Sequence, residues 1–484
     1  MPENPHRPPT MKPHTVPHKT WTLVTVSLGT FMLLLDITIV VVALPAIQHD
    51  LGGGFSQIQW TVDAYALALA VLLLPTGSLA DHYGRRRLFA TGLIVFTIGS
   101  VLCGLSQSPS MLITCRAAQG VGGAAVFATS LALLAQTFQG HKRAMAIGIW
   151  GGVSTASTAI GPVLGGVITT EFGWRWIFLI NLPIGVIAIG AALLRLDESR
   201  HPNARRPDLA GALLFALSLL AIVFGLIRAG HDGWSNTTVT GAILLGALLL
   251  VAFLATEARI RQPMFDLTLF RKPTFVGGSI AALAMNGSLY AMSLYLVLYL
   301  QDGLHYSPLQ TSLRLLVITG ATLLTGLPAG RLSGHLSTRY LIGPGLLLVG
   351  IGLLLMRGLS ADSTWTHLIP GFIVAGLGAG LVNPPLASTA VGVVNQQNAG
   401  VASGMSNTFR QVGIAGSVAV LGSLLASKLG NDSHAKPLAP LSDAINELLL
   451  ISAVIAFTGA ILSTMLIRQR DFLAHRPPPT LEHA

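Results

Sequence analysis

Fourteen separate runs of about twenty apolar residues divide this 484-residue chain, and they constrain its fold more than any single motif does. A helix of about twenty residues spans the hydrocarbon core of a bilayer. Only 10% of the residues are charged and 52% are hydrophobic, whereas a soluble domain has about 25% charged residues. The chain is therefore predicted to be an all-α integral membrane protein with fourteen transmembrane helices.

Several function classes are excluded by the charge pattern and by what the sequence lacks. The formal net charge of +10 does not indicate nucleic-acid binding, because most of the 29 basic residues lie in short loops between apolar runs. The sequence has no G-x-x-x-x-G-K-[ST] phosphate loop, so ATP-driven transport by this chain alone is not expected. The two cysteines, Cys103 and Cys115, fall inside predicted spans and predict neither a disulfide nor a metal site. We expect no cofactor, no bound metal and no enzymatic activity.

The basic residues also predict how the chain is oriented. An even number of spans places both termini on one side, and most Lys and Arg residues, among them Arg85, Arg86 and Arg87, fall in the segments on that side. Because cytoplasmic loops carry the excess of Lys and Arg, both termini are predicted to be cytoplasmic. The protein is expected to be a multi-pass protein of the inner (cytoplasmic) membrane. No cleavable signal peptide is predicted, because the first apolar run is too long for one.

A weak internal repeat suggests two related halves. The loop 77–87 after the second run has a partial counterpart at 330–339 after the tenth run, which lacks the acidic residue. Repeated halves are the usual architecture of secondary transporters. The predicted organisation is two six-helix halves with two helices inserted between them. The segments are a cytoplasmic tail (1–20), an N-terminal half (21–196), the inserted helices 7 and 8 with their flanking loops (197–272), a C-terminal half (273–468) and a second cytoplasmic tail (469–484).

The fifth apolar run, 148–166, is rich in small residues and reads GIWGGVSTASTAIGPVLGG. Small residues let membrane helices approach closely, and a proline bends a helix because it removes a backbone donor. The positions of interest are Gly148, Ser157, Gly161, Pro162, Gly165 and Gly166. Their spacing resembles the antiporter motif of major facilitator exporters, with Ser157 where a glycine is usual. The resemblance favours export over uptake.

Five further segments, in order along the chain, resemble motifs of the major facilitator superfamily and, within it, of the fourteen-helix drug:proton antiporter family. They are 35–45, 77–87, 112–122, 174–183 and 407–413. The resemblance implies a proton-coupled secondary antiporter that exports hydrophobic, often cationic drugs or antibiotics. Its expected partners are a small-molecule substrate, protons and the lipid bilayer, with no nucleic acid, and it is expected to function as a monomer.

Of the 19 acidic residues, only Asp36 and Asp63 fall clearly inside predicted spans. An ionised carboxylate at mid-membrane costs roughly 2.5–3.5 kcal/mol on insertion scales, so each should be protonated, paired or wetted. The resemblance marks Arg116 as a proton-coupling arginine, and we expect these three residues to couple protons. The alternative is a structural Asp36–Arg116 ion pair, with Asp63 wetted from outside. No histidine lies deep in a span, so carboxylates are expected to carry the protons.

The loop after the second run is predicted to gate transport. Asp81 and Arg85 are four residues apart, a spacing at which they can pair, and Gly84 lies between them. Asp81 is also placed to meet a helix N-terminus of the other half. For the substrate pocket, the spans offer polar and aromatic side chains, and aromatic faces bind cations. The candidates are Tyr65, Met285, Tyr290, Tyr295 and Asn383.

Two other functions remain open from the sequence. One is the export of a single endogenous metabolite or antibiotic, for self-resistance. No acidic residue lies deep in the last six spans, and this absence favours such a narrow exporter. The other is a proton-coupled uptake symporter, against which the segment 148–166 argues. The substrate, the proton stoichiometry and the oligomeric state stay open.

Overall fold

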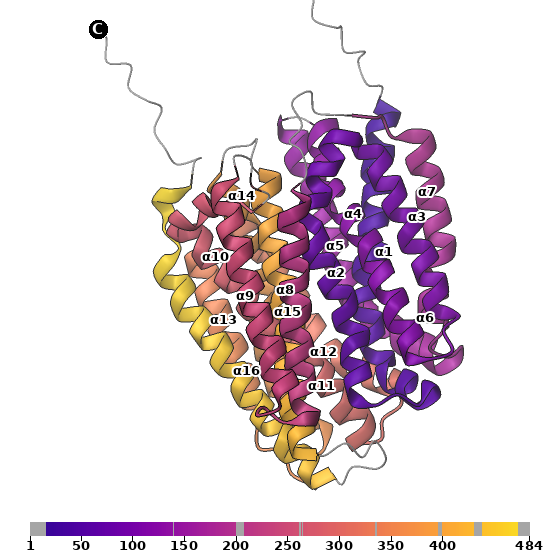
Figure 1. The fold of residues 1–484 in the computed structure, drawn as a ribbon, viewed down its shortest axis with the longest axis vertical. Helices are drawn as coiled ribbons and strands as arrows, with labels where there is room; N and C mark the ends of the chain where they lie inside the picture. Colours follow the sequence, from indigo (N-terminus) through magenta and orange to yellow (C-terminus); the bar gives the residue numbers. More distant parts are fainter. Residues whose placement is uncertain are drawn as a thin grey trace, which may run out of the picture.

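The computed structural model describes residues 16–138, 140–199, 208–260, 263, 265–333, 336–394, 399–429 and 438–472. Over these residues the protein is helical and contains no β-strand. The helices run side by side in one bundle (Figure 1). The first helix, α1 (Val16–Leu51), begins and the last long helix, α16 (Leu438–Leu466), ends at the same end of this bundle. This end is called the terminal end below, and the other is the far end.

The N-terminal half contains six membrane-length segments, of which the last is divided in two. They are α1, α2 (Phe55–Tyr83), α3 (Arg85–Gly104), α4 (Pro109–Thr137), α5 (Gly140–Glu171), and α6 (Trp176–Leu179) followed by α7 (Asn181–Arg195). Local sequence sets the ends of these helices. The Ser108 hydroxyl accepts a hydrogen bond from the amide of Met111, and Pro109 occupies the first helical position of α4, where no donor is needed. Gly84, with φ +116°, makes the turn between α2 and α3.

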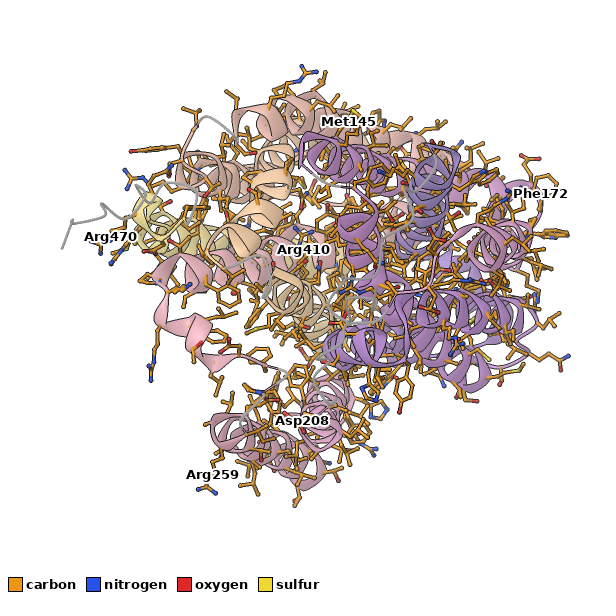
Figure 2. All side chains as sticks on the ribbon, turned by 90° about the horizontal axis from the view of Figure 1, so that it is seen from above. Met145, Phe172, Asp208, Arg259, Arg410 and Arg470 are labelled. Carbon is orange, nitrogen blue, oxygen red and sulfur yellow. The ribbon has the colours of Figure 1, made fainter. Side chains whose placement is uncertain are left out.

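The inserted pair consists of α8 (Leu209–Asp232) and α9 (Thr237–Arg259). The side chains of Asp208 and Asn236 cap these helices by accepting hydrogen bonds from backbone amides. Seen along the bundle, Asp208 and Arg259 mark a helix pair that stands at the edge of the molecule (Figure 2). Helix α8 packs against α2 of the N-terminal half and α15 (Ala399–Leu429) of the C-terminal half. The pair therefore covers one seam between the halves.

The C-terminal half again contains six segments. The first segment is α10 (Pro273–Met285), which continues through η2 (Asn286–Tyr290) and α11 (Ala291–Leu298) to η3 (Tyr299–Gly303). The other five are α12 (Pro308–Leu332), α13 (Arg339–Leu355), η4 (Trp365–Leu368) together with α14 (Ile369–Gly392), α15 and α16. The short helix η1 (Leu267–Arg271) precedes these segments, and η6 (Gln469–Asp471) follows them. The turns η2 and η3 are π-helical. Thirteen segments of the described chain are long and apolar enough to cross a membrane, and α13 is a shorter apolar helix. Together they correspond to the fourteen predicted spans.

The same pairs of helices pack in both halves. The contacts α3–α4, α2–α4, α1–α5 and α3–α7 of the first half recur as α13–α14, α12–α14, α10–α15 and α13–α16 in the second. Glycines permit the closest of these approaches: a Cβ atom at Gly122 would lie 2.7 Å from the carbonyl oxygen of Gly92, and one at Gly378 would lie closer still to that of Gly345. The repeat of two six-helix halves, which the sequence only suggested, is confirmed by this packing.

The two seams between the halves are related by the same repeat. One is formed by α2 and α15 and the other by α5 and α12, so each joins the second helix of one half to the fifth of the other. On the second seam the Ser312 hydroxyl donates to the carbonyl of Pro162 over 2.5 Å, and the amide of Leu309 donates to Thr170 over 3.2 Å. Both hydrogen bonds lie at the far end, where α5 ends and α12 begins.

Candidate functional site

The first part of the site is a buried hydrogen-bond network around Asp36 on α1. A guanidinium nitrogen of Arg116 on α4 lies 2.5 Å from Asp36 Oδ2. Oδ1 accepts hydrogen bonds from Gln119 Nε2 at 2.8 Å and from Asn181 Nδ2 at 3.2 Å. The side chain of Asp36 is 0% exposed and that of Arg116 is 2% exposed. Both carboxylate oxygens are thus satisfied, and the ion pair carries no net charge.

Arg116 is held from several sides. Its Nη1 also donates to Gln119 Oε1 at 2.8 Å, and its Nε donates to the backbone carbonyl of Thr61 on α2 at 3.3 Å. The guanidinium carbon lies 4.2 Å from the ring centre of Tyr65 and 5.8 Å from that of Phe178. These contacts tie α4 to α2 and fix the guanidinium in place. The guanidinium group is therefore held in one position beside the Asp36 carboxylate.

Asp63 on α2 has a different environment. Its side chain is 0% exposed, and both carboxylate oxygens are buried without a hydrogen-bond partner. Burial of an ionised carboxylate without donors is strongly unfavourable, so this conformation favours the neutral acid. The alternative in which Asp63 is wetted from outside does not describe this conformation.

Asp63 lies at the α2–α15 seam. On α2, Gln59 donates to the carbonyl of Val418 on α15 at 3.0 Å, and the carbonyl of Ala70 accepts from Thr408 on α15 at 3.1 Å. Asp63 follows Gln59 by four residues and precedes Ala70 by seven, so all three share one face of α2. The carboxyl group is also close enough to Tyr295 of the C-terminal half for an electrostatic interaction. The unpartnered acid is therefore enclosed between the two halves.

The small residues of α5 serve two different contacts. Gly161 lies against Thr38 of α1, and a Cβ atom at Gly165 would lie 2.7 Å from the carbonyl oxygen of Ile39. A Cβ atom at Gly166 would lie 2.7 Å from the carbonyl oxygen of Pro308 on α12. These glycines thus let α5 pack closely against α1 of its own half and against α12 of the other half.

Two residues of the same predicted motif behave differently. Ser157 is buried, and its hydroxyl donates to the carbonyl of Val153 at 2.6 Å within α5. A Cβ atom at Gly148 would meet nothing within 4 Å, and the same holds for Gly152. Close contact of α5 with its neighbours is therefore concentrated at Gly161, Pro162, Gly165 and Gly166, towards the far end.

The predicted gating loop forms an ion pair within the N-terminal half. Arg85 lies 2.7 Å from Asp81, as its spacing predicts, and also donates to Gln136 of α4 at 3.3 Å. Glu198, which the sequence analysis did not single out, lies against Gly84 and accepts from the amide of Arg86 at 3.2 Å. Among the described residues, the hydrogen-bond donor to Asp81 is Arg85, and no hydrogen bond joins Asp81 to a helix N-terminus of the other half.

The five predicted pocket residues are not brought together. The face of Tyr65 is covered by Arg116, and Met285 is fully buried. Tyr295 is also fully buried, and its hydroxyl donates to the carbonyl of Val418 at 2.5 Å. Tyr290 and Asn383 do meet: Asn383 Nδ2 donates to the Tyr290 hydroxyl at 3.2 Å, and both side chains are partly exposed. Only this pair remains accessible in this conformation.

Sequence reasoning missed other residues of the site. Gln119 and Asn181 complete the network around Asp36, although the sequence showed them only as parts of longer motifs. Arg410 on α15, which the sequence showed only as part of the segment 407–413, lies near the middle of the molecule when viewed along the helices (Figure 2). Within the described residues, no group of three or more His, Cys, Asp or Glu side chains is arranged to hold a metal ion.

Comparison with known proteins gives a consistent result. The model of the Major Facilitator Superfamily matches residues 26–418 and 279–482. The chain is 35% identical to multidrug resistance protein Stp of Mycobacterium tuberculosis (strain CDC 1551 / Oshkosh), over 94% of this chain and 86% of that protein. It is 36% identical to the tetracenomycin C resistance and export protein of Streptomyces glaucescens, over 85% of this chain and 76% of that protein. It is 34% identical to the cephamycin export protein CmcT of Amycolatopsis lactamdurans, over 94% and 93% of the two chains.

The fold is also similar to solved structures. One is the crystal structure of a bacterial homolog of the human lysosomal transporter Spinster in an inward-facing and unoccupied conformation. It aligns with a TM-score of 0.62 and 18% sequence identity, over 96% of this chain and 100% of that chain. At this identity the similarity concerns the fold alone.

Proposed function

This chain belongs to the major facilitator superfamily, is a multi-pass membrane transporter and not an enzyme, and from this premise we propose that it exports hydrophobic drugs or antibiotics in exchange for protons. Relatives that match most of its length are named as a multidrug resistance protein and as export proteins for tetracenomycin C and cephamycin. The terminal end of the bundle is assigned to the cytoplasm because most basic residues lie there. Substrate leaves through the far end while protons enter.

The contrast between two buried acids carries the proposal of proton coupling. Asp36 is saturated by Arg116, Gln119 and Asn181, whereas Asp63 has no hydrogen-bond donor. An acid that is fully paired gains little by binding a proton, but an unpartnered buried acid must hold one. We therefore assign proton exchange to Asp63, and we assign to Asp36 and Arg116 the role of fixing α1, α2 and α4 around it.

The position of Asp63 explains how a proton would be linked to the movement of the halves. Transporters of this architecture alternate by rocking one half against the other. When α2 and α15 are packed together, Asp63 is enclosed and neutral; when they separate, water reaches the carboxyl group and can take the proton. A substrate that enters between the separated halves would favour this open state, in which the carboxyl group loses its proton. Exchange of one for the other then couples export to proton entry.

The loop with Asp81, Gly84 and Arg85 is proposed to act as a gate at the terminal end. It joins α2 to α3, and Arg85 ties the loop to Gln136 at the end of α4. Because the pair is partly exposed, it can open at little cost when the half moves. Gly166, near the far end of α5, supplies the surface on which α5 rocks against α12.

The proposal is tested first by a resistance panel in a host that lacks its own efflux pumps. Wild-type protein should raise resistance to several hydrophobic compounds; resistance to one compound alone would favour the narrow exporter. A compound found in this way is then followed in proteoliposomes under an imposed pH gradient. Uphill movement driven by the gradient supports antiport, whereas accumulation in the same direction as the protons would indicate an uptake symporter.

A further inference from the structure

Arg410 on α15 is an arginine within a membrane span that the proton-coupling network does not use. It lies 11 residues after the first residue of α15, Ala399, and so about 16 Å along the helix at 1.5 Å per residue. Among the described residues it has no hydrogen bond and no ion pair, and it lies close enough to Tyr290 for an electrostatic interaction. A charged side chain at this depth normally faces the bundle interior or a water-filled space and has a partner.

Three faces of α15 are covered by neighbouring helices. Thr408 donates to the carbonyl of Ala70 on α2, and Gly413 packs against the backbone of Leu283. On a third side, the ring of Phe409 packs against Phe265 and Phe270 in the connection between α9 and α10. One face of α15 is therefore not covered by these contacts.

The uncovered face of α15 is polar. It carries Ser403, Asn407 and Arg410, at the spacing i, i+4 and i+7 that puts three side chains on one face of a helix. All three are partly exposed, in contrast with the buried Gly404, Thr408 and Gly413 of the covered faces. Figure 2 shows Arg410 near the middle of the bundle and not on its rim. The guanidinium group thus faces the interior between the halves.

The groups near Arg410 are mostly donors. The hydroxyl of Tyr290, at the end of the π-helical turn η2, accepts from Asn383 and so has its own proton free to donate. π-helical turns of this kind are frequently found at functional sites. Five guanidinium N–H groups and a phenol O–H at one place form a donor-rich surface, which suits an anionic oxygen.

Among the described residues of the C-terminal half, no acid lies deep enough in a span to neutralise Arg410. The acidic residues of the described C-terminal half lie at the ends of its helices and in its loops. They are Asp302, Asp362, Asp443, Glu447 and Asp471. The interior of this half therefore keeps an uncompensated positive charge, which would repel a cationic group.

We propose that Arg410, assisted by Tyr290 and Asn383, binds an acidic group, a carboxylate or an ionised phenol, on the apolar compound that is exported. The inference rests on the proposed export function and narrows its substrate class to apolar compounds with an anionic group. The anion supplies the counter-charge that the C-terminal half lacks, and the apolar part lies against the surrounding helices.

The test uses the full-length protein in nanodiscs of neutral lipid and three matched probes: 1-pyrenebutyrate, its methyl ester and the corresponding pyrenylbutyl trimethylammonium cation. Binding is followed by energy transfer from the protein's tryptophans to pyrene, with empty nanodiscs as the blank. Wild-type protein should bind the carboxylate about tenfold or more tightly than the ester, as expected for a charge-assisted hydrogen bond. Arg410→Gln should bind both with similar affinity, while its affinity for the ester stays at the wild-type value.

Two further variants keep the result decisive. Arg410→Glu should reverse the preference towards the cation, which a merely misfolded protein would not do. Arg314→Gln removes the other arginine within a C-terminal span, which stacks on Tyr306 and Trp365, and should leave the preference unchanged. A wild-type protein without preference, or an Arg410→Gln variant with the wild-type preference, would overturn the inference. Proton-driven export by the wild type, and its dependence on Asp63, would stand in either case, so the two proposals fail separately.

Discussion

The carboxylate of Asp36 on α1 and the guanidinium of Arg116 on α4 lie 2.5 Å apart, although 80 residues separate them in the chain. Both are buried, and Gln119 bonds to each of them. Asp63 is also fully buried, but its oxygens have no hydrogen-bond donor. Two acids that look alike in sequence are therefore proposed to have different tasks, with Asp36 fixing the half and Asp63 exchanging the proton.

Asp63→Asn is expected to abolish proton-driven export while leaving the fold intact. An amide has nearly the shape of the neutral acid but cannot release a proton. Transport into proteoliposomes driven by an imposed pH gradient should fall more than tenfold, whereas exchange of labelled for unlabelled substrate should persist. Asp50→Asn, which removes an exposed carboxylate from the same half, is the matched control and should behave as the wild type. A variant that keeps the wild-type response to the pH gradient would exclude Asp63 as the coupling acid.

Asp36→Asn is expected to lower stability as well as transport. Removing one partner of a buried ion pair leaves the other charge unpaired, which costs about 3–5 kcal/mol. The thermal unfolding temperature of the purified variant should therefore drop clearly, and the double variant with Arg116→Gln should lose less than the sum of the two single changes. Arg175→Gln, which breaks an exposed pair with Asp50, should change stability by no more than about 1 kcal/mol. Additive losses in the double variant would show that the pair is not coupled.

Gly165→Leu is expected to impair export much more than Gly148→Leu, although both belong to the same predicted motif. A side chain at Gly165 would collide with the backbone of Ile39 on α1, whereas one at Gly148 would meet no atom within 4 Å. Resistance conferred by each variant, normalised to the amount of protein in the membrane, measures the difference. Equal resistance from the two variants would mean that close packing of α5 on α1 is not needed for transport.

Asp81→Asn is expected to reduce the transport rate with little change in stability. The Asp81–Arg85 pair is partly exposed, and such pairs contribute about 1 kcal/mol or less. The exchanged pair, with Asp81→Arg and Arg85→Asp together, should recover part of the rate because it restores the attraction. Arg87→Gln serves as the control, since its side chain is largely exposed. If the exchanged pair is no faster than the single variant, the loop does not act through this attraction.

Much of the fold follows from local sequence. The lengths of the apolar runs predict the spans, and prolines such as Pro109 and Pro308 begin helices where their missing donor does no harm. The pair of Asp81 and Arg85 was predictable because both lie on one helix turn. The pocket was not predictable, because Tyr65, Met285 and Tyr295 are buried among neighbours that come from other helices. Arg410 was noted only as part of the segment 407–413, because its depth in a span says nothing about its partners.

By itself the sequence determined how many helices cross the membrane, that the chain is a transporter of repeated halves, and which acids lie within the spans. Hydropathy and charge are properties of short segments, so they can be read along the chain. Only the tertiary structure decided that Asp36 meets Arg116, Gln119 and Asn181 while Asp63 is enclosed against α15 without a donor. The state of a buried acid depends on donors supplied by other helices, and the way helices pack in space is set by small residues and side-chain shape.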